Sequence, residues 1–404
     1  MRLLVLSNGH GEDQIAVRIV KQLQSIVKEL ELAALPIVGQ GYAYKDSNIT
    51  IAGRVKQMPS GGFIYMGGNP LWQDLRGGLV QLTLEQIKLV RQWGKNGGAV
   101  LAVGDIVPLL YAWLSRANYA FVGTAKSEYY LRDEQGWLDR TSTIERSLGS
   151  VYLPWERWLM SRDACKGVFP RDSLTAKVLQ QHSIAAYDLG NPMMDRISTR
   201  VQPRELVLNV LLLAGSRMPE ALRNWRQILV AISKINADSF NKPLQFLGAI
   251  APALNLDLFI EAAIARGWEI YRSESQLCIL KQNDVSLILQ QSSYDQLLHQ
   301  ADVAIAMAGT ATEEFVGLGK PAIVMPGEGP QFTPAFAEAQ SRLLGCSVIM
   351  VESSDLVGET LIKVMQDERR LQQIALNGKR RMGEAGAAKR IAQCLQQTLL
   401  AESI

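Results

Sequence analysis

Short apolar runs alternate with amphipathic segments along most of the chain. Such a run, ended by glycine or polar residues and followed by a segment with apolar residues on one side, is typical of a buried strand and the helix after it. Repetition of this pattern predicts an α/β protein built on open sheets. Strands are predicted at 3–6, 99–103, 207–214, 303–307 and 322–325, and helices at 13–30, 79–93 and 220–235.

The chain is predicted to divide near residue 200. Its 404 residues exceed one ordinary domain and indicate two or three. The polar run at 198–205 has the composition of a linker, and the glycine turn at 215–217 repeats the pattern of the turn at 7–11, so two similar halves are expected. The predicted parts are an N-terminal domain at 1–200, a C-terminal domain at 205–382 and a final helix at 387–401.

Composition and charge exclude several classes of protein. Hydrophobic residues make up 48% of the chain, which supplies a large core. The 42 basic and 39 acidic residues nearly balance, whereas a nucleic-acid protein usually carries a basic excess. The four cysteines form no Cys-x-x-Cys pair, so neither a zinc site nor a disulfide framework is indicated. No apolar run approaches the ~18 to 20 residues of a membrane span. We therefore expect a cytoplasmic enzyme-like protein without a metal.

The most informative stretch is 301–326. A small apolar strand at 303–307, a turn at 308–310 and a helix starting at Thr310 would present unpaired N–H groups and a positive helix end to an anion. Glu313 and Glu314 fall in the first turns of that helix, where a carboxylate can also accept hydrogen bonds from a ribose. The combination suggests a nucleotide. The alternative is that Thr310 and the two glutamates only cap a helix.

Other turns at strand ends carry further candidates. His10 lies in the glycine turn after the first strand and can take up a proton near neutral pH, although a loop histidine can also be structural or solvated. Asp105 follows a buried strand and either caps a helix or faces an acceptor. Arg217 is well placed for a diphosphate, because a guanidinium matches phosphate oxygens with paired donors. Gln331, in the loop after the strand at 322–325, can reach a sugar hydroxyl.

The segment 59–78 is unusual because three Gly-Gly pairs interrupt large apolar residues. Phe63, Met66 and Trp72 belong to it. The segment is too apolar for an exposed loop and too rich in glycine for a stable helix. It is either a loop folded onto the core or a flap that binds an acceptor or dips into a membrane. Basic residues near the C-terminus, Lys379 to Arg381 among them, are interpreted as a solvated face, with attraction to anionic lipid as the alternative.

Four motifs resemble those of lipid-A-disaccharide synthase. Leu-Ala-Gly-Ser-Arg-Met-Pro-Glu at 213–220 resembles its Pro-Gly-Ser-Arg-x-x-Glu motif, and Ala-Gly-Thr-Ala-Thr-Glu-Glu at 308–314 resembles its Ser-Gly-Thr-x-x-x-Glu motif. Leu-Gly-Asn-Pro-Met-Met-Asp at 189–195 is similar to the turn before its second domain, and the loop at 8–13 stands where it has Gly-Glu-x-Ser-Gly-Asp. The chain thus resembles the lipid-A-disaccharide synthase-related family over most of its length.

The resemblance implies the GT-B architecture: two Rossmann-like domains that face a central cleft, with a C-terminal helix that crosses back to the N-terminal domain. It implies that Glu314 binds the donor ribose, that Gln331 contacts the donor sugar, and that His10 or Asp13 is the base. It also implies that the diphosphate is held by Gly215, Ser216, Arg217, Ala308, Gly309 and Thr310. The acceptor side is predicted from the turns and the apolar segment themselves and would include Gly9, Gly11, Phe63, Met66, Trp72 and Asp105.

The expected function is an inverting, metal-independent glycosyltransferase. It would move a sugar from a UDP-sugar to a lipid or other hydrophobic acceptor at the cytoplasmic face of a membrane, using no cofactor; related synthases can form homodimers. Ala214 and Ala308 depart from the family's proline and serine, and the loop after Val324 and the apolar flap also differ, so these departures bear most on the acceptor. A nucleotide-sugar 2-epimerase of the same fold ranks lower, because it would need further acids near the sugar and no apolar flap. A non-catalytic binder of sugar nucleotides or lipids is the third possibility.

Overall fold

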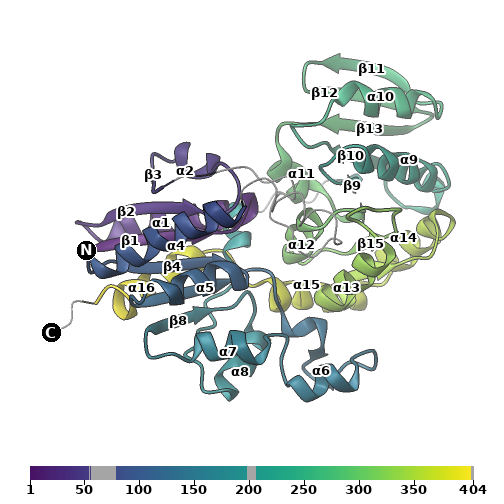
Figure 1. The fold of residues 1–404 in the computed structure, drawn as a ribbon. Helices are drawn as coiled ribbons and strands as arrows, with labels where there is room; N and C mark the ends of the chain where they lie inside the picture. Colours follow the sequence, from purple (N-terminus) through teal and green to yellow (C-terminus); the bar gives the residue numbers. More distant parts are fainter. Residues whose placement is uncertain (54, 56–78, 198–205, 402–404) are drawn as a thin grey trace. The chain divides into compact units, whose positions relative to one another are not determined.

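The computed structural model describes residues 1–53, 55, 79–197 and 206–401. The chain forms two compact units (Figure 1). Unit 1 consists of Met1–Arg196 together with Glu384–Ile404, and unit 2 is the continuous segment Ile197–Gly383. Each unit has its own sheet flanked by helices, as the strand–helix pattern predicts.

Unit 1 contains a six-stranded sheet with the order β3-β2-β1-β4-β5-β8, and every pair in it is parallel. Because β1 is central and side chains alternate between the faces of a strand, its residues enter two separate cores. Leu3 and Val5 pack on one face, and Leu4 and Leu6 on the other. The strands are β1 (Arg2–Ser7), β2 (Glu31–Pro36), β3 (Thr50–Ile51), β4 (Ala99–Gly104), β5 (Tyr119–Gly123) and β8 (Cys165–Phe169).

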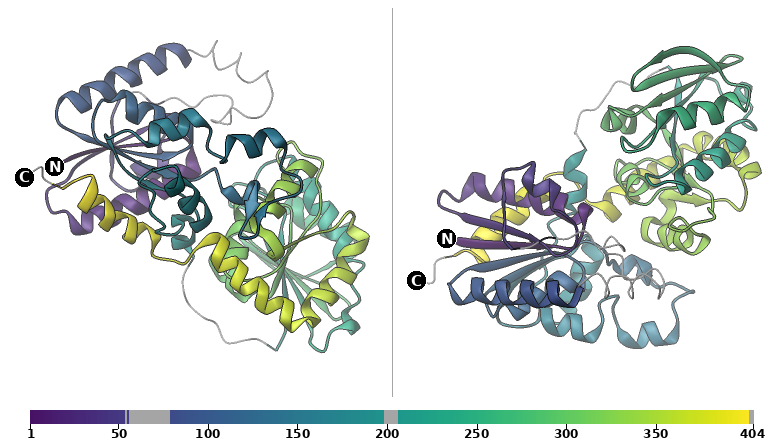
Figure 2. Two further views of the ribbon diagram at one scale, coloured as in Figure 1. Left: turned by 90° about the horizontal axis from the view of Figure 1, so that it is seen from below. Right: turned by 45° about the horizontal axis from the view of Figure 1, so that its top comes forward.

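Helices cover both faces of this sheet (Figure 2). One core includes residues of α1 and α16, and the other includes residues of α4, α5, α7 and α8. The helices of unit 1 are α1 (His10–Ile26), α2 (Tyr42–Lys45), α4 (Leu79–Lys95), α5 (Ile106–Leu114), α6 (Thr143–Leu148), α7 (Pro154–Met160), α8 (Ser173–Gln181) and α16 (Ala387–Thr398).

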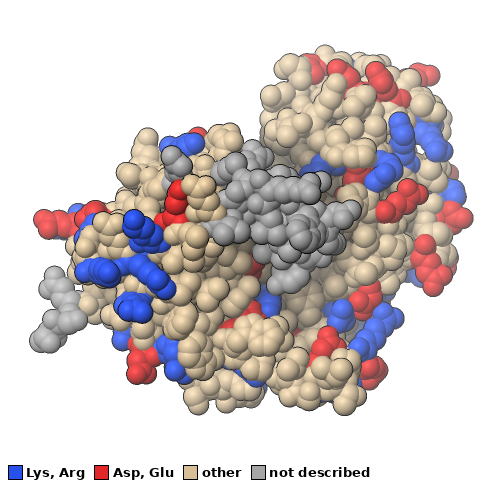
Figure 3. Space-filling view, in the orientation of Figure 1, with Lys and Arg blue, Asp and Glu red and all other residues tan. Residues whose placement is uncertain are grey.

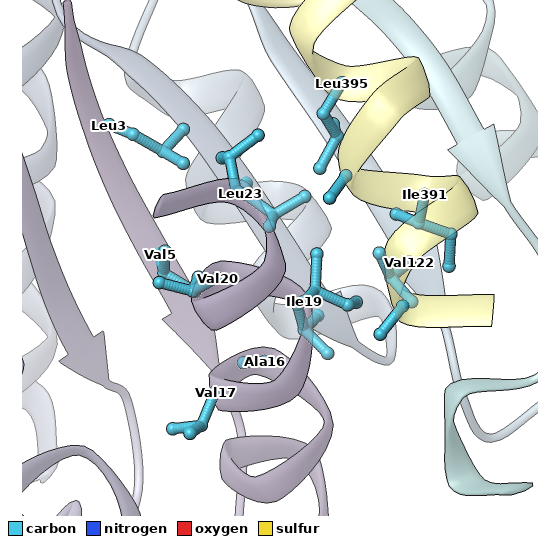
Figure 4. Packing of buried hydrophobic residues seen from close by; sticks show 14 of the residues in the cluster. Leu3, Val5, Ala16, Val17, Ile19, Val20, Leu23, Val122, Ile391 and Leu395 are labelled. Atoms are coloured by element: carbon cyan, nitrogen blue, oxygen red, sulfur yellow. The ribbon is translucent and has the colours of Figure 1, made fainter. Parts of the chain in front are cut away.

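The C-terminal helix α16 belongs to unit 1. Its Ile391 and Leu395 pack with Ile19 and Leu23 of α1 (Figure 4). The start of α16 is held by Asp195, whose carboxylate accepts hydrogen bonds from the N–H groups of Gly386, Ala387 and Ala388 at 2.6, 3.0 and 2.7 Å. A carboxylate at this end of a helix also interacts favourably with the helix dipole. The predicted return of the last helix to the first domain is therefore confirmed.

Unit 2 contains an eight-stranded sheet with the order β11-β12-β13-β10-β9-β14-β15-β16. β11, β12 and β13 pair antiparallel, and the remaining pairs are parallel. Strand β12 was not predicted from the sequence. The strands are β9 (Leu208–Leu213), β10 (Leu244–Ala249), β11 (Glu269–Glu274), β12 (Leu277–Gln282), β13 (Val285–Gln290), β14 (Val303–Ala306), β15 (Ala322–Val324) and β16 (Val348–Met350).

The helices of unit 2 follow the predicted alternation. They are α9 (Glu220–Ile232), α10 (Leu256–Ile264), α11 (Tyr294–Gln300), α12 (Thr310–Gly317), α13 (Pro334–Leu344), α14 (Val357–Gln366) and α15 (Glu368–Met382). Two Rossmann-like α/β units with parallel strands at their centres thus confirm the predicted fold class.

On the face of the molecule seen in Figure 3, Lys and Arg form small groups on both units, with Asp and Glu among them. Arg381 corrects one expectation, because it is not on a solvated face. It is buried, and its Nη1 donates to the carbonyl groups of Arg342 and Leu343 at 3.0 and 3.2 Å. Within the part of the chain that the structure describes, we find no helix long and apolar enough to cross a bilayer.

Candidate functional site

In unit 1 the C-terminal ends of β1 and β4 are neighbours, and the strand order reverses between them. Open α/β sheets bind ligands at this position. The side chains that follow the two strands contact each other: Asn8 Nδ2 donates to both carboxylate oxygens of Asp105 at 3.2 Å. Asp105 also accepts from the Val107 N–H at 2.9 Å and is therefore the N-cap of α5. The predicted cap is observed, and the acceptor contact stays a prediction.

Asp13 lies in the first turn of α1 with only 2% of its surface exposed. The Ser7 hydroxyl donates to Asp13 Oδ1 at 2.5 Å and lies 2.7 Å from the Tyr44 hydroxyl. Burial raises the pKa of Asp13 to about 6; the hydrogen bond from Ser7 opposes the rise and the charge of Glu12 adds to it. Burial also raises the pKa of Tyr44, so its hydroxyl stays protonated. Asp13 can thus gain or lose a proton close to neutral pH.

Glu12 occupies a space that two glycines leave open. A Cβ at Gly104 would lie 3.3 Å from Glu12 Cγ, and a Cβ at Gly9 would lie 3.0 Å from Glu12 Oε2; both glycines have positive φ angles. Burial, and then the charge of Asp105, raise the pKa of the Glu12 carboxyl. We call Glu12, Asp13 and Asp105 the carboxyl cluster. Raised pKa values such as those of Glu12 and Asp13 are common among groups that transfer protons.

The other residues predicted for this side of the site are only partly described. His10 is the first residue of α1, but its side chain lies outside the described part of the structure, as do Phe63, Met66 and Trp72. Gly9 is the N-cap of α1 and Gly11 is exposed in its first turn. Contacts of these residues with a substrate stay predictions.

In unit 2 two turns follow the neighbouring strands β9 and β14. After β9, Gly215 has a φ angle of 96°, and Ser216 and Arg217 are exposed. After β14, Gly309 precedes α12, and among the described residues no side chain caps it. The first N–H groups of a helix have no partner within the helix, and the helix dipole favours an anion there. The predicted diphosphate residues thus lie on adjacent turns.

Side chains from inside unit 2 bind the carbonyl groups of both turns. Asn224 Nδ2 donates to the carbonyl oxygens of Ala214 and Met307 at 3.1 and 3.3 Å. Gln340 Nε2 donates to those of Ala308 and Gly309, both at 3.1 Å, and the Thr312 hydroxyl donates to that of Ala308 at 2.6 Å. These bonds fix the backbone of the two turns with their carbonyl groups directed into the domain.

Glu314 and Gln331 lie beside these turns. Glu314 is 3% exposed, and its Oε2 accepts a hydrogen bond from the Tyr294 hydroxyl at 2.7 Å. Gln331 is half-buried in the loop after β15, and its N–H donates to the carboxylate of Glu220. Contacts with ribose and sugar stay predictions for both.

Sequence patterns missed the residues that support each turn. Ser7 and Tyr44 were not proposed in unit 1, nor were Asn224 and Gln340 in unit 2. Glu12 and Glu220 lie within the quoted motifs, and their carboxylates at the starts of α1 and α9 were the available signal. In the described ranges no cluster of three or more His, Cys, Asp or Glu could hold a metal ion.

No protein-family model matches the chain, and no curated protein matches it. Solved structures do. The UDP-GlcNAc 2-epimerase from Neisseria meningitidis, bound to UDP-GlcNAc, has a TM-score of 0.57 and 15% identity over 98% of this chain and 100% of its own. MurG from Acinetobacter baumannii has a TM-score of 0.58 and 14% identity over 98% and 99%. The calicheamicin glycosyltransferase CalG4 has a TM-score of 0.58 and 14% identity over 100% and 99%.

These likenesses cover almost the whole of both chains, and they establish that the fold is GT-B. Because the identities are so low, they establish the fold alone. One fold can support several reactions, so the chemistry has to be argued from the residues of the two units.

Proposed function

We propose that the chain is an enzyme that acts on a UDP-sugar, whose diphosphate binds at the ends of β9 and β14. The observation that carries the proposal is the binding of the turn carbonyl groups by Asn224 and Gln340. A carbonyl oxygen that faced a phosphate would repel it. The N–H groups of Thr312 and Glu313 donate to the Gly309 carbonyl, so those of Thr310 and Ala311 are the ones that we propose to bind the anion. The exposed Arg217 adds paired donors.

The nucleotide is proposed to be uridine diphosphate. Solved structures of the same fold include one bound to UDP-GlcNAc, which makes this compound the first substrate to test. Glu314 is the proposed ribose ligand, on the resemblance of 308–314 to the motif of lipid-A-disaccharide synthase. The bond from Tyr294 to Glu314 Oε2 would then orient the carboxylate toward the ribose.

Epimerisation at C2 of the sugar is the reaction that we favour. In such an inversion a base removes the C2 proton while UDP leaves C1 with the electron pair of the broken C1–O bond, and a double bond forms between C1 and C2. Return of a proton to the other face of C2 and of UDP to C1 then gives a product with the composition of the substrate. This requires more than one acid or base, and unit 1 brings Glu12 and Asp13 together with raised pKa values. The carboxyl cluster offers acids of the kind that an epimerase would need, and this supports the proposed reaction.

Glycosyl transfer is the second candidate, and the motifs at 213–220 and 308–314 favour it. One group of unit 1 would take the proton of an acceptor hydroxyl, the hydroxyl oxygen would bond to C1 of the sugar, and UDP would leave with the electron pair of the broken bond. A lipid acceptor, a peripheral membrane location and a homodimer belong to this candidate.

The test of the reaction is incubation with UDP-GlcNAc in D₂O, followed by NMR. An epimerase incorporates deuterium at C2 and inverts that centre without an acceptor. A transferase leaves the C2 proton in place and releases UDP only with an acceptor. Binding of UDP without reaction under either condition would leave a non-catalytic binder.

The test of the donor site is a thermal-shift titration with uridine, adenosine and guanosine diphosphates. A ligand that binds only the native state raises its stability with concentration. We expect selective stabilisation by UDP that is lost in Glu314→Ala. The absence of a shift with all three nucleotides would overturn the proposal.

A further inference from the structure

The polar face of α9 holds the loop at 326–333, which carries Gln331. Three side chains of the helix bind this loop along its length. Gln227 Nε2 donates to the Pro326 carbonyl at 3.2 Å, and Arg223 Nη2 donates to the Gly329 carbonyl. Glu220 Oε1 accepts from the N–H groups of Gln331 and Phe332 at 3.1 and 2.6 Å. Residues three and four positions apart share one face of a helix, which explains how a single helix binds a whole loop.

Glu220 binds two successive N–H groups of the loop through a buried carboxylate. It is 6% exposed, and a carboxylate taken out of water needs hydrogen-bond donors to offset its lost hydration. Hydrogen bonds to a charged group are about twice as strong as neutral ones. The two N–H groups that it binds belong to Gln331 and the next residue, so Glu220 fixes the backbone at the position from which the Gln331 side chain extends.

The loop has little room to adopt another conformation. A Cβ at Gly327 would lie 2.6 Å from the Phe332 carbonyl oxygen and 3.2 Å from Asn224 Oδ1. Phe332 is buried, and its ring centroid is 5.5 Å from that of Phe336. A Cβ at Gly309 would in turn lie 3.4 Å from the Phe336 ring. Phe336 of α13 thus lies between Phe332 of the loop and Gly309 at the start of α12.

Helix α9 also begins just after the turn at 215–217, which is proposed to bind the diphosphate. Glu220 is the first residue of α9, three positions after Arg217, and the Ala221 N–H donates to the Arg217 carbonyl at 2.9 Å. The first turn of α9 thus joins the residues proposed to bind the diphosphate to the loop that carries Gln331.

We propose that Glu220 is a positioning residue for recognition of the sugar of the nucleotide. It holds Gln331 and Phe332 so that the Gln331 side chain meets sugar hydroxyl groups, and it makes no contact with the nucleotide. The inference rests on the proposed UDP-sugar function and extends it. It assigns recognition of the sugar to the 326–333 loop, and it assigns to α9 the role of holding that loop in its conformation.

The experiment compares the affinities of UDP and UDP-GlcNAc, measured by calorimetry, in the wild type, Glu220→Ala, Glu220→Gln and Gln331→Ala. Glu261→Ala, which changes an exposed carboxylate on α10, is the matched control. We expect Glu220→Ala to weaken UDP-GlcNAc about tenfold, as for loss of a hydrogen bond to a charged group, and UDP less than twofold. Gln331→Ala should reproduce this selective loss. Glu220→Gln keeps an acceptor oxygen and should retain most of the affinity for the sugar nucleotide.

Hydrogen exchange gives a readout that needs no ligand. In Glu220→Ala the amides of 331 and 332 should exchange faster, whereas Gln331→Ala should leave the Phe332 amide protected. Equal weakening of UDP and UDP-GlcNAc in Glu220→Ala, or no weakening of either, would overturn the inference while the wild type still binds UDP. A wild type that binds no UDP would instead overturn the proposed function, and this inference with it.

Discussion

In both units two neighbouring parallel strands end at turns that begin helices, β1 and β4 in unit 1 and β9 and β14 in unit 2. In unit 1 this edge carries carboxyl groups, and burial raises the pKa of Glu12 and Asp13. In unit 2 the corresponding edge carries Arg217 and a helix start, with the turn carbonyl groups bound by amide side chains. One strand–turn–helix plan thus places carboxyl groups with raised pKa values at this edge in unit 1, for which we propose proton transfer. In unit 2 it places a helix start beside Arg217, for which we propose anion binding.

The difference shows that the backbone plan sets where a ligand can bind, while a few side chains set which chemistry occurs there. Ser7 and Tyr44 accommodate a buried acid in unit 1. In unit 2, Asn224 and Gln340 bind the carbonyl groups of the two turns, so that these oxygens do not face the proposed anion site. Substitutions at these positions can therefore separate proton transfer from nucleotide binding.

The largest effect is expected from Glu12→Gln, which removes a proton-transfer group of unit 1. Turnover of UDP-GlcNAc should fall about 10²-fold or more, the usual contribution of a general acid or base, while the dissociation constant of UDP is unchanged. His10→Ala, predicted from the sequence, should behave in the same way. Steady-state kinetics and calorimetry measure the two quantities, with the exposed Glu29→Gln as the control. An equal loss of UDP binding would contradict the division of labour between the units.

Asp13→Asn should change the pH dependence of stability. The folded-state pKa of about 6 lies above the 3.8 of an unperturbed aspartate, so the folded state holds this proton more tightly than the unfolded state. The contribution of Asp13 to the free energy of unfolding is fully present below about pH 4 and is lost as the pH rises through 6. It amounts to about 3 kcal/mol at most. Urea unfolding from pH 4 to 7.5 should show the wild type losing stability relative to Asp13→Asn. A constant difference between the two proteins would contradict burial as the cause.

Arg217→Ala should weaken UDP binding without changing the chemistry of unit 1. Loss of a charged donor to phosphate costs about 1.5–3 kcal/mol, or roughly 10- to 100-fold in the dissociation constant. Arg226→Ala, which removes an exposed arginine of α9, is the matched control. Calorimetric titration with UDP measures the change. Equal dissociation constants in the two variants would remove Arg217 from the diphosphate site.

The smallest effect is expected from Gln340→Leu. The carbonyl groups of Ala308 and Gly309 both lose the Gln340 amide, but the Thr312 hydroxyl still donates to the first, and the N–H groups of Thr312 and Glu313 still donate to the second. The free energy of unfolding should therefore fall by only about 1 kcal/mol. UDP affinity should also fall a few-fold, because the turn is less fixed. Denaturant unfolding and UDP titration check both, and the exposed Gln373→Leu on α15 is the control. Lower stability with unchanged UDP affinity would show that Gln340 supports only the fold.

Local patterns predicted the central elements because these are apolar and periodic. The strand predicted at 3–6 is observed as Arg2–Ser7, and the one predicted at 303–307 as Val303–Ala306. The edge of the unit 2 sheet was harder to predict. β11 is exposed along its whole length, so it lacks the alternation that identifies a half-buried strand, and its hairpin partner β12 was missed.

The site was predictable only where a motif lies within a few residues of sequence. Arg217 and Gly309 come from such motifs. The contact of Ser7 with Tyr44 spans 37 positions, and that of Glu220 with Phe332 spans 112. Contacts across such distances depend on the order of strands in the sheet, which spacing along one sequence does not show. The carboxyl cluster and the support of the 326–333 loop therefore required the structure.

The bond between Asp195 and the start of α16 has a consequence for synthesis of the chain on the ribosome. Unit 2 is one continuous segment, whereas the core of unit 1 includes residues of the last helix. Domains generally fold as units, the N-terminal one first, while elongation proceeds at about 5–20 residues per second. Here the first unit to emerge is completed last. The face of α1 that packs against Ile391 and Leu395 stays uncovered while unit 2 is synthesised. At the rates given above this takes on the order of 10–40 s.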